Sequence, residues 1–268
     1  MQISVFTDEI SPRSPERAID LARSWGVTHL EIRSLPGGRF PAGPDSELDD
    51  LYRRIAEAGL AVSGVSPGFC KCSWDHPSVA HSLEADLPRA CEWAQRWGTD
   101  IVSCFAFLRE AATNMPAAVI DLLGSMSEIT RGQGCKLALE NEAGCWGNTG
   151  IEAASIIRQV GPERISLCWD PGNSARAGTD FPYPDEYLKI RELVSHVHMK
   201  NVDPTDRAWS LIESGVVDWP GQLSALSDDG FTGFLVVETH LHGASDLPGL
   251  EQNTLHNLAF VRSCLERL

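Results

Sequence analysis

Residues 136–142 read Lys-Leu-Ala-Leu-Glu-Asn-Glu, and they begin a pattern that organises much of the chain. Leu137, Ala138 and Leu139 form a short apolar run, which is typical of a strand buried on both faces. The run ends in a carboxylate, an amide and a second carboxylate. A buried strand that turns acidic at its last residues fits a parallel barrel, because the strand ends open onto the active site there.

This pattern of an apolar run followed by a metal-binding side chain occurs three more times. The later examples are residues 165–169 before Asp170, 194–197 before His198 and 234–237 before Glu238. Between such runs lie helical segments with ordinary start and stop signals. Ser14-Pro15-Glu16, for instance, begins a helix that Gly26 ends.

The whole chain reads as eight strands alternating with eight helices. Strict alternation implies parallel strands joined by right-handed crossovers. We therefore predict a single-domain α/β fold, a (β/α)₈ TIM barrel over residues 1–268. An open doubly wound sheet is the alternative, but no glycine-rich phosphate turn follows the first strand. Residues 201–217 are expected to form a long loop.

Composition restricts the class of partner. A formal net charge of -15 argues against a nucleic-acid partner, since binding to phosphates needs a basic face. No apolar run approaches the roughly 18 residues of a membrane span, and the N-terminus shows no signal-peptide pattern. Cys104, Cys135 and Cys168 lie within apolar runs, which predicts free buried thiols rather than disulfides. We expect a cytoplasmic protein with no membrane partner.

Four strand-end residues form the strongest candidate site. Glu140, Asp170, His198 and Glu238 would surround one side of a closed barrel's mouth. Three carboxylates and an imidazole suit one fairly hard divalent ion, with Mn²⁺ preferred and Mg²⁺ or Co²⁺ as alternatives. Without a cation the three carboxylates would repel one another. The competing interpretation is that each is a lone polar residue at a strand end.

Four motifs carry a family resemblance that covers essentially the whole chain. They are Leu-Glu-Asn at 139–141, Trp-Asp-Pro-Gly-Asn at 169–173, His-Val-His-Met-Lys-Asn at 196–201 and Val-Glu-Thr-His at 237–240. The chain resembles the xylose isomerase-like barrel family of sugar isomerases and epimerases. This resemblance implies that Glu140, Asp170, His198 and Glu238 bind one divalent ion and that the two glutamates also move protons.

The chain departs from the epimerases of this family at two positions. Asn173 stands where they usually have a histidine that contacts the substrate. They also tend to carry an arginine six residues after the metal-bound histidine. Here that position is Pro204, with Arg207 nearby and Lys200 two residues after His198. A different substrate or reaction is therefore compatible with the motifs.

A sugar or similar hydroxy-ketone would react at this site by proton transfer. The ion would act as a Lewis acid and stabilise the enediolate formed when the proton next to the carbonyl leaves. Glu140 and Glu238 are the expected acid–base pair, and Lys200 either donates to the developing oxyanion or forms a salt bridge. Return of the proton to the same carbon gives epimerisation, and return to the neighbouring carbon gives aldose–ketose isomerisation.

Other residues after predicted strands are candidates for substrate contact or pocket walls. They are Glu9, Glu31, Arg33, Phe69, Lys71, Phe107, Trp146, Asn173, Arg207 and His240. His240 or His242 is expected to support the Glu238 ligand, and a rival metal site there is not expected. No arginine-rich anion site is apparent in the sequence, which favours an unphosphorylated carbohydrate.

Three alternatives remain open at this stage. A lyase of the same family, a dehydratase or a C-glycoside-cleaving enzyme with a second subunit, would use the same metal and base. A nuclease like the related apurinic-site endonucleases is disfavoured by the acidic charge. A non-catalytic binding module would be expected to lack some of the four ligands. The family resemblance also allows a homo-oligomer.

Overall fold

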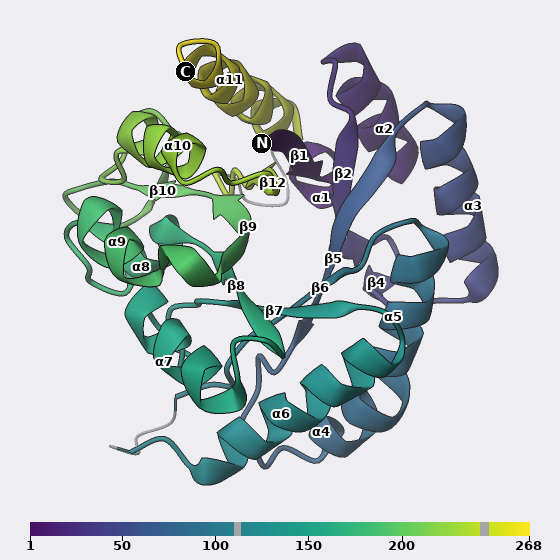
Figure 1. Ribbon diagram of the computed structural model, residues 1–268. Coiled ribbons are helices and arrows are strands. Elements are labelled where there is room, and N and C mark those ends of the chain that lie inside the picture. The colour runs from purple at the N-terminus through teal and green to yellow at the C-terminus, as the bar shows by residue number, and fades with distance from the viewer. Residues whose placement is uncertain (110–113, 242–246) are drawn as a thin grey trace.

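The chain folds as one closed barrel of parallel strands surrounded by helices (Figure 1). The computed structural model describes residues 1–109, 114–241 and 247–268. In chain order the barrel strands are β1 (Gln2–Phe6), β2 (His29–Ile32), β5 (Ala61–Phe69), β6 (Ile101–Cys104), β7 (Lys136–Glu140), β8 (Ile165–Trp169), β9 (Val194–Met199) and β12 (Phe234–Val237). Each pairs in parallel with the next, and β12 closes the ring on β1. The predicted (β/α)₈ barrel is confirmed, and the open sheet is excluded.

Helices form the outer layer of the barrel (Figure 1). They are α1 (Thr7–Ile10), α2 (Pro15–Ser24), α3 (Asp45–Glu57), α4 (Ser78–His81), α5 (Leu87–Arg96), α6 (Ala117–Gly132), α7 (Gly150–Val160), α8 (Pro171–Arg176), α9 (Tyr187–Ile190), α10 (Trp219–Asp228) and α11 (Leu247–Leu265). A π-helical turn at 82–86 continues α4. A second π-helical turn at 182–186 precedes α9, and a 3-10 turn at 191–193 follows it. Ser14 caps α2 by accepting from the amide of Arg17, as its sequence predicts.

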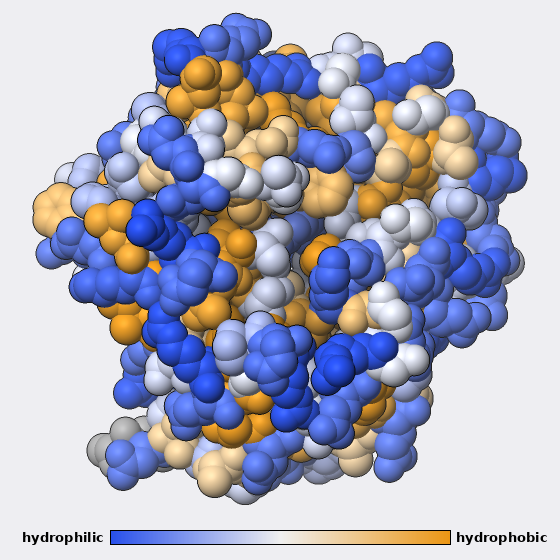
Figure 2. All heavy atoms as spheres, in the orientation of Figure 1, coloured by the Kyte–Doolittle hydropathy of each residue, from blue (hydrophilic) through white to orange (hydrophobic). Residues whose placement is uncertain are grey.

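The apolar faces of the helices pack against the outside of the strands. Leu30, Leu167 and Val197 have no solvent exposure, which is expected of strands buried on both faces. Each such side chain contributes roughly 1.5–3 kcal/mol by leaving water. Figure 2 shows hydrophilic side chains predominating over the outer helices, with apolar atoms between them. This packing fixes the strand ends that carry the candidate site.

Two short hairpins extend the barrel at the predicted loops. β3 (Ser34–Leu35) pairs antiparallel with β4 (Gly38–Arg39), and β10 (Asn201–Val202) pairs with β11 (Trp209–Ser210). The long loop expected over 201–217 therefore contains a short hairpin. Asn201 Nδ2 donates to the carbonyls of Ile212 (2.7 Å) and Val217 (3.2 Å), which organises this segment without an apolar pattern in its sequence.

The remaining sequence expectations about the fold concern cysteines and membranes. All eight cysteines are free thiols, and six of them are buried, as predicted. Among the described residues, no helix is both long enough and apolar enough to cross a bilayer.

Candidate metal centre

Four neighbouring strands bring the predicted ligands together. Glu140 is the last residue of β7, Asp170 follows β8, His198 lies on β9, and Glu238 follows β12. One carboxylate oxygen or imidazole nitrogen from each lies within 4.8 Å of the others. All four residues are at most 4% exposed, so the cluster is almost completely removed from water.

Local contacts hold Asp170 in place. Its Oδ1 accepts the backbone N–H of Asn173 at 2.9 Å and caps α8. Asn141 Oδ1 accepts the Asp170 N–H (2.9 Å), while Asn141 Nδ2 donates to the Asp170 carbonyl (2.7 Å). Gly172 allows α8 to lie close to Lys200, since a Cβ at position 172 would be 2.7 Å from the Cβ of Lys200. The second oxygen of Asp170 therefore remains available in the cluster.

The donor atoms of the cluster are of a type and a burial that suit a divalent ion. Asp170 Oδ2, His198 Nδ1 and Glu238 Oε2 are buried and make no directed hydrogen bond among the described residues. The two carboxylate oxygens lie 2.8 and 2.9 Å from the ammonium of Lys200 instead. Carboxylate oxygens and an imidazole nitrogen are the ligands of ions such as Mn²⁺ and Mg²⁺. The chemistry of the donor set thus matches one such ion.

The ammonium group of Lys200 lies among the same carboxylates. Its Nζ is 2.8 Å from Asp170 Oδ2, 2.9 Å from Glu238 Oε2 and 3.6 Å from an oxygen of Glu140. Burial opposes the charge, but these carboxylates hold the pKa of Lys200 well above its ordinary value. Burial raises the pKa of Asp170 to about 7 despite the nearby ammonium. Lys200 therefore supplies one positive charge to a site with three acids.

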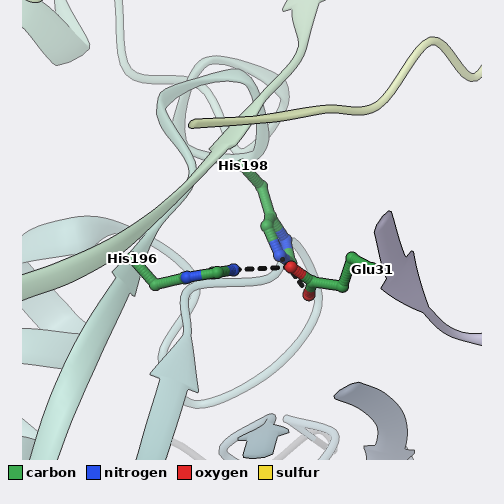
Figure 3. Close-up of side chains that lie close together, drawn as sticks. All are labelled: Glu31, His196 and His198. Atoms are coloured by element: carbon green, nitrogen blue, oxygen red, sulfur yellow. Dashed lines mark hydrogen bonds and ion pairs between the residues drawn. The ribbon is translucent and has the colours of Figure 1, made fainter. Parts of the chain in front are cut away.

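The carboxylate of Glu31, outside the four-residue cluster, orients the imidazole of His198 (Figure 3). Glu31 on β2 lies between two rings of β9, with Oε2 2.6 Å from His196 Nε2 and Oε1 3.1 Å from His198 Nε2. His196 and His198 both point inward because alternate residues of a strand share a face. Burial acts to raise the pKa of Glu31, but the two imidazoles hold it far below its ordinary range. Glu31 thus fixes His198 with Nδ1 toward the cluster.

Arg33 and His240 hold the other side of Glu238. Arg33 pairs with Asp8 (2.9 Å), with Glu9 (2.5 Å) and with Glu238. His240 bridges Glu9 (Nδ1, 2.7 Å) and Glu238 (Nε2, 3.0 Å). Burial opposes its charge, yet the two carboxylates raise the pKa of His240 to about 9. His240 therefore contacts the same two carboxylates, Glu9 and Glu238, that pair with Arg33.

A cavity of about 300 Å³ opens over the cluster. It is lined by Phe6, Asp8, Arg33, Ser34, Arg39, Ser66, Lys71, Phe105, Glu140, Glu142, Asn173, Lys200, Trp209, Glu238 and His240. The predicted contacts Arg33, Lys71, Asn173, Lys200 and His240 are among these residues. Asn173 Nδ2 donates to oxygens of Glu140 (3.2 Å) and Glu142 (3.2 Å), so it contacts a candidate catalytic group directly.

Other predicted contacts lie away from this cavity. Glu31 is wholly buried beneath the site, and Glu9 lies behind Arg33. Phe69 lines an adjoining cavity, and the ring of Trp146 is covered by the guanidinium of Arg109. Phe107 is also buried and lines a smaller apolar pocket. Arg207 binds Asp180 (2.8 Å) and the carbonyl of Ala175 (3.2 Å). His242 lies outside the described residues.

Three of the lining residues that the sequence did not single out are Arg39, Phe105 and Trp209. Phe105 follows β6, Trp209 lies in the second hairpin, and Arg39 lies in the first. Trp209 packs against the edge of His240 with ring centroids 5.3 Å apart. Hairpin residues have no fixed place in a barrel's strand–helix alternation. Only the fold brings these side chains to the cavity.

Comparison with known proteins identifies the family. A family model described as the xylose isomerase-like TIM barrel matches residues 19–264. The chain belongs to this family. A search of curated proteins found no match.

Solved structures of the same fold include several enzymes. One is a D-psicose 3-epimerase with D-tagatose from Clostridium cellulolyticum (15% identity, TM-score 0.75, covering 99% of this chain and 99% of that one). Another is a probable 3-DHS dehydratase from Bacillus anthracis (15%, 0.75, covering 95% and 97%). A third is a xylose isomerase-like barrel protein from Mycobacterium smegmatis in complex with magnesium (21%, 0.71, covering 99% and 97%). At these identities the likeness shows the shared fold.

Proposed function

We propose that the protein is a divalent-metal-dependent isomerase or epimerase of a carbohydrate hydroxy-ketone. One observation carries the proposal: Glu140 and Glu238 border one cavity and belong to a buried cluster of three carboxylates and an imidazole whose ligand atoms lie within 4.8 Å of one another. Mn²⁺ is the expected ion, with Mg²⁺ or Co²⁺ as alternatives. Membership of the family and the sugar epimerases among the structural neighbours support this choice.

In this proposal the two glutamates transfer protons at opposite faces of the substrate. Glu140 ends β7 and Glu238 follows β12, with β8 and β9 between them in the barrel wall. One can take the proton next to the carbonyl, and the other can return a proton from the opposite side. A divalent ion held by the cluster would supply Lewis-acid stabilisation of the negative charge that develops on the substrate oxygens.

Neighbouring side chains keep both glutamates ready to act as bases. Burial alone would raise the pKa of Glu140, but His198 and Lys200 lower it. Burial would likewise raise the pKa of Glu238, and Lys200, His240 and Arg33 hold it well below its ordinary range. Both side chains are therefore carboxylates at neutral pH. Asn173 Nδ2 orients Glu140 by donating to Oε1.

A lyase that uses the same base is the second candidate. His240 lines the cavity with its Nε2 3.0 Å from Glu238, so a proton donor lies beside a proposed base. That pairing could protonate a leaving hydroxyl group after the adjacent proton is removed. A probable dehydratase also shares the fold at a TM-score of 0.75. Loss of water from a substrate would distinguish this reaction from simple isomerisation.

Metal content and solvent deuterium exchange test the proposal together. The wild type, Glu140→Gln and Glu238→Gln would be purified, loaded with Mn²⁺ and incubated in heavy water with a panel of ketoses. Glu128→Gln is the matched control, since this exposed carboxylate on α6 pairs only with Arg164 among the described residues. We expect one ion per wild-type chain and deuterium at the carbon next to the carbonyl. Both site variants should lose the exchange.

The position of the label separates the reactions. Deuterium with inversion at one carbon indicates epimerisation, and label at the former carbonyl carbon indicates aldose–ketose isomerisation. Consumption of the sugar with release of water would favour the lyase. Wild-type protein that binds no divalent ion under metal-replete conditions would rule out the four-ligand centre and the mechanism built on it.

A further inference from the structure

Arg39 differs from the other cations around the cavity. Arg33, Lys71 and Lys200 each pair with a carboxylate that also lines the cavity: Asp8 at 2.9 Å, Glu142 at 3.0 Å and Glu238 at 2.9 Å. Arg39 makes no such pair with any residue that the structure describes. Its Nε donates to the backbone carbonyl of Pro67 at 3.2 Å, so most of its guanidinium donors remain available.

The backbone is shaped to hold this guanidinium in place. Arg39 ends β4, and the carbonyl it contacts belongs to Pro67, near the C-terminal end of β5. A Cβ at Gly68 would lie 2.7 Å from Arg39 Nε and 2.9 Å from its Cζ, so only glycine leaves room for this approach. Gly68 also has φ +77°, a conformation that other residues rarely adopt. Arg39 is exposed, and its guanidinium rests against the β5 backbone.

Arg39 also lies where two cavities meet. It lines both the cavity of about 300 Å³ over the metal ligands and an adjoining one of about 320 Å³. Lys71 is the other residue that lines both. The adjoining cavity contains one carboxylate, Asp86, which lies beside His81 (3.6 Å) and Ser82 (3.3 Å). A ligand that extends from the metal ligands toward the second cavity must pass both cations.

We propose that Arg39, assisted by Lys71, binds an anionic group of the substrate, either a carboxylate or a phosphate. This inference rests on the proposed function, because the reacting carbons would lie at the metal ligands, which border the first cavity and not the adjoining one. A planar guanidinium donates two parallel hydrogen bonds to either anion. The substrate is then an acidic or phosphorylated sugar-like ketone. The sequence had favoured an unphosphorylated substrate, because no arginine-rich anion site was apparent in it. Arg39 and Lys71 are 32 residues apart and form no local motif.

A matched set of ketoses tests this anion site. D-fructose, D-fructuronate and D-fructose 6-phosphate share a carbon skeleton and differ at C6 by a hydroxyl, a carboxylate or a phosphate. Their binding to the Mn²⁺-loaded protein would be measured by calorimetry for the wild type, Arg39→Gln and Arg39→Lys. Arg96→Gln is the control, since it removes one positive charge from α5, where Arg96 pairs with Asp49.

We expect one of the two anionic ligands to bind the wild type about 10- to 100-fold more tightly than fructose. Which anion is preferred identifies the group. Arg39→Gln should abolish that preference while leaving Mn²⁺ affinity unchanged, Arg39→Lys should retain part of it, and Arg96→Gln should retain all of it. Equal affinity for the three ligands, a preference that survives in Arg39→Gln, or no binding of either anion at millimolar concentrations would overturn the proposal.

Deuterium exchange on the same ligands separates this inference from the proposed function. Exchange without any preference for the anions overturns the anion site and leaves the isomerase proposal standing. A preference that depends on Arg39, with no exchange on any ligand, supports the anion site and counts against the isomerase chemistry. Unfolding temperatures of the variants, measured alongside, should match the wild type because Arg39 makes no ion pair among the described residues.

Discussion

The two halves of the barrel mouth differ in the sign and the burial of their charged side chains. The half formed by β7, β8, β9 and β12 presents acids that are almost fully buried and share one internal ammonium, that of Lys200. The half that follows β2 and β5 presents the cations Arg39 and Lys71, which remain in contact with water. Buried charges interact strongly and suit chemistry, while exposed charges suit recognition of an incoming ligand. The groups proposed to react and those proposed to recognise the substrate thus come from different arcs of one ring.

Removing a ligand from the buried half should have the largest effect. Asp170→Asn keeps the helix cap but loses a charged ligand oxygen, so we expect loss of the bound ion and of proton exchange by roughly a thousandfold, about 4 kcal/mol. Metal analysis and deuterium exchange would measure this. Asp100→Asn, which changes a half-exposed carboxylate paired with Lys136 at the start of β7, is the control and should change neither. An Asp170→Asn variant with a full complement of metal would contradict the assignment.

Lys200→Met tests how the buried half balances its charge without an ion. The variant leaves three acids near one another with no ammonium, which should destabilise the metal-free protein by about 3–5 kcal/mol. Added Mn²⁺ would replace the lost charge, so the increase in unfolding temperature on adding metal should be larger for the variant than for the wild type. Thermal unfolding with and without Mn²⁺ measures this difference. An equal increase in both proteins would show that Lys200 and the ion occupy independent positions.

The buried half could be predicted from sequence, and the physical reason is the strand itself. Glu140, Asp170 and Glu238 each directly follow or end an apolar run, and a barrel places consecutive strand ends side by side. His198 was found in the same way, one strand earlier than Glu238. A buried strand gives a strong local signal in the sequence, and the residue at its C-terminal end must lie at the mouth of the barrel.

Of the half that presents Arg39 and Lys71, the sequence singled out Lys71, but Arg39 could not be predicted in this way. Arg39 lies in a two-residue strand of a hairpin whose approach to Gly68 depends on the finished barrel. Glu31 was expected near the substrate, but its strand position directs it inward beneath His198. Arg207 follows His198 by nine residues, yet the second hairpin turns it toward Asp180. These placements depend on tertiary contacts between segments far apart in sequence.

A smaller effect is expected beneath the metal ligands. Glu31→Gln keeps the size of the side chain but can no longer accept from both imidazoles and from the Ser66 hydroxyl (2.7 Å) as a carboxylate does. Loss of such a supporting group costs about 10- to 100-fold in metal affinity. Calorimetric titration with Mn²⁺ would measure it. Ser103→Ala, which removes only the donor to Ser66 Oγ (2.8 Å), should retain near-normal affinity, and an unchanged affinity in Glu31→Gln would show that His198 needs no orienting partner.

The smallest effect is expected at the border between the two halves, where Glu142 pairs with Lys71. Glu142→Gln should free Lys71 to bind the anionic group of a ligand. The pair is partly exposed, and such pairs contribute about 0–1 kcal/mol, so the preferred anionic ketose should bind up to about fivefold more tightly. Fructose affinity should stay the same, because the hydroxyl at its C6 carries no charge. Since Arg39→Gln removes the principal contact, the gain from Glu142→Gln should largely vanish in the double variant. A full gain in that background would assign the anion to Lys71 alone and leave Arg39 without a role in recognition.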